Sequence, residues 1–174
     1  MRGFLSLVAL ITRAGAVMAA LVIAAMVGHI LLEIVLRAAF DRSTYVLDEF
    51  VGYGVAASTF LGLGHALERG SLIRVNLLLP RVRHRKLRQG LELLCVTACF
   101  AVFALVWWSF CKSVTRHWAR GSVSETMAQV PLWVPEGLLL LGLSIFMLQL
   151  LAYALRVVCG QPMLGERVES ETSE

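Results

Sequence analysis

The chain has 174 residues, of which 58% are hydrophobic and 16% are charged, and its formal net charge is +4 at pH 7. Soluble domains average about 45–50% apolar and about 25% charged residues, so this composition indicates a membrane protein. The sequence lacks a G-x-S-x-G elbow, an H-E-x-x-H zinc motif and a P-loop, and nothing in it supports enzyme activity.

Four apolar runs divide the chain, and they span residues 14–36, 46–67, 91–114 and 135–158. At a rise of about 1.5 Å per residue, each run can cross a hydrocarbon core about 30 Å thick. We therefore predict an all-α integral membrane protein in which residues 14–158 form four transmembrane helices, accompanied by amphipathic surface helices.

Residues 1–13 are predicted to lie on the inner membrane surface ahead of the first span. Phe4–Ile11, followed by Ala14-Gly15-Ala16, also resembles a signal peptide with its cleavage site. Arg13 interrupts that pattern, and the apolar run resumes without a polar mature domain, so we favour an uncleaved segment.

The first span carries an ionisable stripe made of His29, Glu33 and Arg37. Their spacing of four residues places them on one face of a helix. An ionisable residue at membrane depth is a functional hypothesis by default, and the stripe is a candidate subunit interface. Local pairing of Glu33 with Arg37 or His29 is the structural alternative, and the sequence leaves both open.

The second span opens with Asp48 and Glu49 and carries small residues every four positions, at Gly54, Ser58, Gly62 and Ala66. Small side chains at this spacing allow membrane helices to approach closely. We interpret this stripe as a packing face, and therefore as part of a candidate subunit interface.

The connector after the second span is strongly basic, with seven Lys and Arg residues between Arg69 and Arg88. With both termini inside, eleven Lys and Arg residues lie on the inner side and five on the outer side (Arg37, Arg42, Lys112, Arg116 and Arg120). This bias predicts that both termini and the basic connector are cytoplasmic. Since the positive-inside rule accounts for the basic run, we expect no nucleic-acid partner.

Apolar residues in this connector recur at helical spacing, at Leu72, Val75, Leu79 and Val82. We expect a short surface helix there and a second one starting at Pro80, with Arg and Lys facing anionic lipid headgroups. The next connector, residues 112–134, is predicted to face outward, with Gly121 ending the third helix and Trp133 at the membrane interface.

No cofactor is expected in this chain. His29 and His65 differ in depth by roughly 15–20 Å at helical rise, too far to bind one haem iron. Cys95 and Cys99 lie one turn apart in the third span, where a thiol is normally an apolar filler, and further metal ligands are missing.

Three segments resemble one known family: "LDEF" at the start of the second span, "ERGSLIRVNLLLP" after it, and "VPLWVPEGLLLLG" leading into the fourth. The family is the DctQ-type small membrane subunit of tripartite ATP-independent periplasmic (TRAP) transporters. The motif positions are Asp48, Glu49, Gly70, Ile73, Arg74, Asn76, Pro131 and Trp133. Asn76 stands where family members usually carry Asp.

The resemblance implies a scaffold role in the bacterial inner membrane. Such a subunit pairs with a large elevator-type subunit that carries the substrate and sodium sites, and it helps to dock a periplasmic substrate-binding protein for uptake of an organic acid. Two alternatives remain at this point: a self-sufficient proton-coupled exporter that uses Glu33, and a haem or anchor subunit of a membrane enzyme. The sequence does not name the solute.

Overall fold

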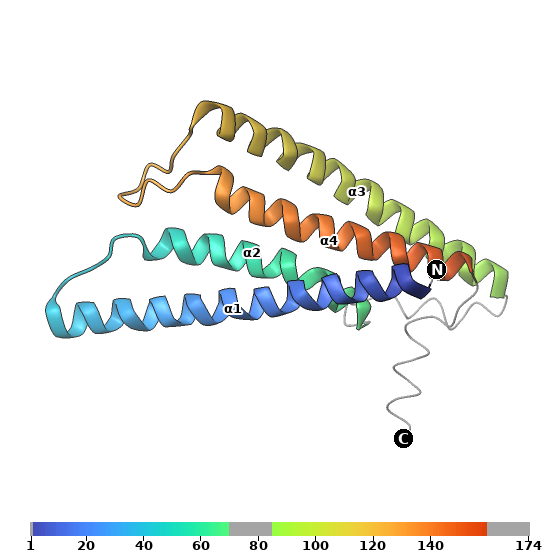
Figure 1. The fold of residues 1–174 in the computed structure, drawn as a ribbon, viewed down its shortest axis with the longest axis horizontal. Helices are drawn as coiled ribbons and strands as arrows, with labels where there is room; N and C mark the ends of the chain where they lie inside the picture. Colours follow the sequence, from blue (N-terminus) through green and yellow to red (C-terminus); the bar gives the residue numbers. More distant parts are fainter. Residues whose placement is uncertain (1, 70–84, 160–174) are drawn as a thin grey trace, which may run out of the picture.

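The computed structural model describes residues 2–69 and 85–159, and within these ranges it contains four helices (Figure 1). They are α1 (Arg2–Phe40), α2 (Leu47–Glu68), α3 (Arg85–Arg120) and α4 (Trp133–Val158). Each helix is long and apolar enough to cross a membrane. The prediction of an all-α, four-span membrane protein is therefore confirmed.

The helices run up and down in chain order, so the two short connectors, residues 41–46 and 121–132, lie together at one end. We call this the loop end, and the opposite end, where α1 begins and α4 finishes, the terminal end. Helix α2 lies between α1 and α4, and α3 packs on α4. The four helices converge at the terminal end and fan apart toward the loop end (Figure 1).

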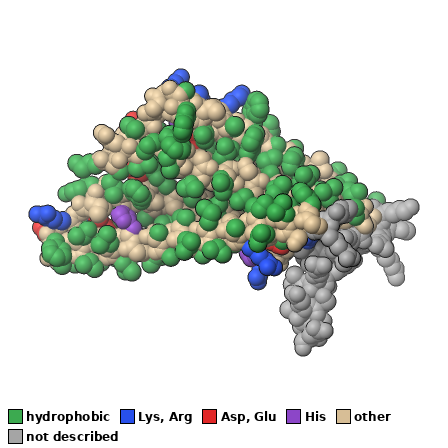
Figure 2. All heavy atoms as spheres, in the orientation of Figure 1, with side chains coloured by type: hydrophobic (Ala, Val, Ile, Leu, Met, Phe, Trp, Pro, Cys, Tyr) green, Lys and Arg blue, Asp and Glu red, His purple; other side chains and the backbone are tan. Residues whose placement is uncertain are grey.

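Each helix contains one long stretch, of 18 or 19 residues, without Asp, Glu, Lys or Arg: residues 14–32, 50–67, 93–111 and 137–155. These stretches are about 27–29 Å long, which matches a hydrocarbon core about 30 Å thick. The ionisable residues that flank them therefore mark the two membrane boundaries. Figure 2 agrees, because hydrophobic side chains cover the flanks of the helices while Lys and Arg gather toward their ends.

Helices α1 and α3 extend well beyond these boundaries, which differs from the expected spans. Residues 2–13 form no separate surface segment but the first turns of α1, a continuous helix of 39 residues. Val8 and Thr12 are buried there, so this part of α1 packs against the bundle. The surface helices expected between residues 70 and 84 lie outside the described residues.

Helices α2 and α4 approach each other closely at Gly142. A Cβ atom added at Gly142 of α4 would lie 2.7 Å from the carbonyl carbon of Phe60 and 2.8 Å from the amide nitrogen of Leu61. Only glycine fits at this crossing, since both neighbours belong to the backbone of α2. Farther along α4, Phe146 and Leu150 form a buried cluster with Leu67 of α2, and Val96, Phe100 and Phe103 of α3 pack against this cluster.

Within the bundle, the buried line of α2 coincides only in part with the small-residue stripe. The buried positions of α2 are Gly54, Ala57, Leu61, Gly64 and Leu67. A helix has 3.6 residues per turn, so a stripe of every fourth residue drifts away from a straight contact line. Ser58 and Gly62 are consequently only half-buried, with Gly62 near Ala19 of α1.

Candidate functional site

The ionisable groups of the described residues are not arranged as a metal site. Within residues 2–69 and 85–159, no group of three or more His, Cys, Asp or Glu side chains is placed to hold a metal ion. The loop end instead carries a layer of hydrogen bonds in which two glutamates hold the connectors and a third joins α3 to α4.

Glu33 holds the connector between α1 and α2. Its side chain is 2% exposed, and its carboxylate pairs with Arg37 at 2.8 Å. The same carboxylate accepts hydrogen bonds from the Thr44 amide at 3.0 Å, from the Thr44 hydroxyl at 2.6 Å and from the Ser43 hydroxyl. These four hydrogen bonds, from Arg37, Ser43 and Thr44, occupy the acceptor sites of both carboxylate oxygens.

The connector itself adopts a backbone that depends on this anchor. Asp41 and Tyr45 have positive φ angles of 49° and 58°, a region that non-glycine residues enter only at a cost. The Ser43 hydroxyl also accepts hydrogen bonds from Arg37 and from the Tyr45 amide. Glu33 therefore fixes the shape of the α1–α2 turn, and the i,i+4 partner expected for it, Arg37, is in place.

His29 lies one turn below Glu33 on α1 and faces α2. Its ring is 5.8 Å from the ring of Phe50, and its Nε2 atom is buried without a hydrogen-bond partner among the described residues. Among the described residues, no hydrogen bond links His29 to Glu33. The predicted stripe therefore divides into an aromatic contact of His29 and a separate ion pair between Glu33 and Arg37.

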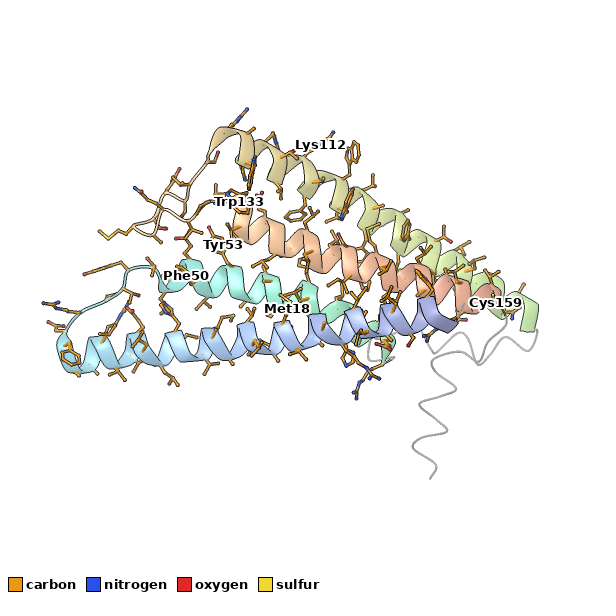
Figure 3. The ribbon with its side chains drawn as sticks, in the orientation of Figure 1. Met18, Phe50, Tyr53, Lys112, Trp133 and Cys159 are labelled. Atoms are coloured by element: carbon orange, nitrogen blue, oxygen red, sulfur yellow. The ribbon has the colours of Figure 1, made fainter. Side chains whose placement is uncertain are left out.

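Glu49 ties α2 to the other connector. Its carboxylate accepts hydrogen bonds from the Tyr53 hydroxyl at 2.8 Å and from the Thr126 hydroxyl. Thr126 belongs to the 121–132 connector, whose two sides pair at Val123 and Pro131. Figure 3 shows Phe50 and Tyr53 on α2 at this end and Trp133 at the start of α4.

Glu136 ties α3 to α4. It accepts a hydrogen bond from the Ser113 hydroxyl at 3.1 Å and pairs with Nδ1 of His117 at 3.0 Å. One turn farther out, the rings of Trp118 and Trp133 meet edge to face with their centroids 4.6 Å apart. Gly121, with φ of +60°, follows the last residue of α3, as its position in the sequence predicts.

The three glutamates share one role. Each sits at the loop-end boundary of a different helix, and each accepts hydrogen bonds from a connector or from the neighbouring helix. A carboxylate at this depth needs such donors, because burying an unpaired charge is costly. The result is a fixed arrangement of the loop end where the bundle is otherwise most splayed.

A smaller cluster joins α1 to α2 at the terminal end. The Thr12 hydroxyl, fully buried, lies 2.8 Å from a carboxylate oxygen of Glu68. His65 approaches the same carboxylate at 3.6 Å and accepts a hydrogen bond from Arg69. Helix α1 is thus attached to α2 near both membrane boundaries.

The remaining residues singled out in the sequence have other places. Asp48 and Pro131 are exposed at the loop end. Ser58 donates its hydroxyl to the Val55 carbonyl of its own helix. Gly70, Ile73, Arg74 and Asn76, the most specific part of the family-like motif, lie outside the described residues.

Sequence reasoning missed the donors that complete the loop end. Ser43, Thr44 and Thr126 belong to connectors, where serine and threonine are ordinary and carry no periodic signal. Glu136 could have been found, because it is an acidic residue at the start of an apolar run, as Glu49 is. Its partner His117 stands at the end of the preceding helix, which a short connector must bring close.

Comparison with known families gives a match to "Tripartite ATP-independent periplasmic transporters, DctQ component" over residues 26–160. The matched region begins within α1 and includes all of α2, α3 and α4. No curated protein and no solved structure matches the chain.

Proposed function

Since the chain belongs to the DctQ component family of TRAP transporters, we propose that it is the static scaffold of a three-part uptake system. In this proposal it pairs with a large multi-span subunit that moves the solute, and it helps to dock a periplasmic substrate-binding protein. The family match over most of the chain is the observation that carries the proposal.

The packing of the bundle supports a static role. The α2–α4 crossing brings backbone against backbone at Gly142, and the loop end is held by glutamates on three helices. Elements that move in transport are drawn from loosely held parts of a structure. In this proposal the large subunit binds the transported solute and the coupling sodium ions.

Glu33 is better suited to structure than to proton transport. The exporter alternative needs a carboxylate that solute and protons can reach, whereas this carboxylate is 2% exposed and surrounded by Arg37, Ser43 and Thr44. A charged group that accepts this many hydrogen bonds is held in one state. The scaffold role requires only that it stay there.

The proposed orientation places the loop end in the periplasm and both termini in the cytoplasm of a bacterial inner membrane. It rests on the excess of Lys and Arg in the terminal-end segments of the sequence. A cysteine at Met127, which is 82% exposed in the loop-end connector, tests the orientation in a variant lacking the four natural cysteines. Labelling of intact spheroplasts by a membrane-impermeant maleimide is expected, and labelling only after lysis would invert the proposed topology.

The scaffold role is tested by dividing the system. The chain and the large subunit, expressed together, are expected to co-purify in mild detergent and to take up solute in proteoliposomes only when both are present with the binding protein. The chain alone is expected to transport nothing. Uptake by the purified chain alone, or full uptake by the large subunit without it, would contradict the proposal.

A further inference from the structure

Three of the five cations assigned to the outer side of the sequence lie on one helix face. Lys112, Arg116 and Arg120 are spaced by four residues along the end of α3, and all three are exposed. We call them the basic stripe. The positive-inside rule disfavours cations at this end, so topology does not explain why they are gathered here.

The basic stripe is not used to hold the fold. Among residues 85–159, no acidic side chain forms an ion pair with any of the three, although Glu125 follows in the connector and Glu136 faces the next turn of α3. Arg116 donates its Nε hydrogen to the Lys112 carbonyl at 3.2 Å, and Lys112 lies over the Trp108 ring at 5.2 Å. The side chains of Lys112 and Arg116 are thus held by local contacts, while neither forms an ion pair within this part of the chain.

The part of α3 that carries the basic stripe is held in place by contacts with α4. Ser113 and His117, on the adjoining face of α3, bind Glu136 of α4, and Trp118 packs against Trp133. Figure 3 shows Lys112 on the side of α3 that is turned away from α4. Figure 2 shows Lys and Arg atoms exposed along the same edge of the molecule. A binding partner would therefore meet three cations already in place.

The length of the stripe decides between lipid and protein as the partner. From Lys112, the first charged residue after the apolar stretch 93–111, to Arg120 the helix rises about 12 Å. The headgroup layer adds only roughly 5–7 Å to each side of the hydrocarbon core. Even a helix tilted by 40° keeps about 9 Å of that rise, so the stripe reaches beyond the lipid.

We propose that the basic stripe, Lys112, Arg116 and Arg120, is a contact surface for an acidic patch on the periplasmic substrate-binding protein. This inference rests on the proposed function, because it requires a periplasmic loop end and a binding protein that docks there. Exposed charges at the edge of an interface mainly raise the association rate and make it sensitive to salt. The stripe would guide the binding protein to the loop end.

The test uses the complete complex of this chain and its large subunit in nanodiscs, with the fluorescently labelled cognate binding protein as the probe. Replacing Lys112, Arg116 and Arg120 together with Gln is expected to lower the association rate at low salt about tenfold and to flatten its salt dependence. The dissociation rate should change much less. The same effect is expected in phosphatidylcholine and in phosphatidylglycerol-containing nanodiscs.

Two controls isolate charge from fold. The charge-retaining variant Lys112→Arg, Arg116→Lys, Arg120→Lys should associate like the wild type. Arg42→Gln, which removes another exposed cation of the loop end, should also leave the rate unchanged. If the triple Gln variant fails to assemble with the large subunit, Arg116→Gln and Arg120→Gln measured singly should each slow association two- to threefold.

Several outcomes overturn the inference. An unchanged association rate in the triple variant does so, as does a loss that appears only with phosphatidylglycerol, which would assign the stripe to lipid headgroups. A charge-retaining variant as slow as the Gln variant would show that shape and not charge matters. Absence of binding by the wild-type complex would overturn the proposed docking function itself, whereas wild-type binding that survives the triple substitution overturns only this inference.

Discussion

The crossing of α2 and α4 at Gly142 gives the sharpest test of how the bundle is held. We predict that Gly142→Ala destabilises the protein, whereas Gly137→Ala, on the same helix, does not. A Cβ at Gly142 would meet the Phe60 carbonyl carbon at 2.7 Å, the Leu61 amide nitrogen at 2.8 Å and the Phe60 Cβ at 2.9 Å. A Cβ at Gly137 meets nothing within 4 Å.

The expected size follows from these distances. Carbon atoms are in favourable contact at about 3.5–4.0 Å, so α2 and α4 would have to separate by roughly 0.7 Å or more. A gap of that size forfeits a quarter to a half of the dispersion attraction of each contact. Overpacking of this kind costs about 1–3 kcal/mol. Both substitutions gain up to about 1 kcal/mol of helix propensity, so their difference isolates the packing cost.

The measurement is the free energy of unfolding of the purified chain in mixed micelles, titrated with SDS and followed by tryptophan fluorescence. Gly142→Ala should be about 1–3 kcal/mol less stable than Gly137→Ala. Gly54→Ala should fall between them, because the nearest atoms there belong to the flexible side chain of Met26. Equal stability of the Gly142 and Gly137 variants would refute the close backbone contact.

Two further predictions concern the loop end. Glu33→Gln should keep uptake by the full three-part system within a few-fold of wild type, and complete loss of uptake in an assembled Glu33→Gln complex would make Glu33 a participant in transport. Glu33→Leu should make the 41–46 connector sensitive to protease, because each hydrogen-bond donor left unpaired costs about 1–3 kcal/mol. A double-mutant cycle with Glu49→Gln and Thr126→Val should give a coupling energy of about 0.5–3 kcal/mol in the same SDS titration, and a value near zero would mean that their hydrogen bond does not hold the connector.

The number and type of the helices could be predicted from the sequence, because about 20 apolar residues between charges satisfy a bilayer in only a few ways. Their lengths could not. Charged residues mark where the hydrocarbon ends, but a helix continues past that point as long as its backbone meets no break. Helix α3 runs nine residues beyond the apolar stretch 93–111 and stops at Gly121, the one residue near its end with a positive φ.

The loop end could be predicted only in part. The pairing of Glu33 with Arg37 follows from helical spacing, since both groups lie on one element. The contacts of Glu33 with Thr44 and of Glu49 with Thr126 depend on how a connector folds back over a helix, and no periodic pattern reports that. The buried line of α2 within the bundle could not be predicted for a related reason, since it is set by where α1 and α4 cross this helix.

The two attachments of α1, at Thr12–Glu68 and at Glu33–Thr44, have a mechanical consequence. They lie about 32 Å apart along a rod of about 58 Å, so turning α1 by 3° about one attachment would shift the other by about 1.7 Å. A hydrogen bond of 2.6 or 2.8 Å does not survive that shift. Helix α1 is therefore attached at two points, and a rotation of a few degrees relative to α2 breaks at least one of the two attachments.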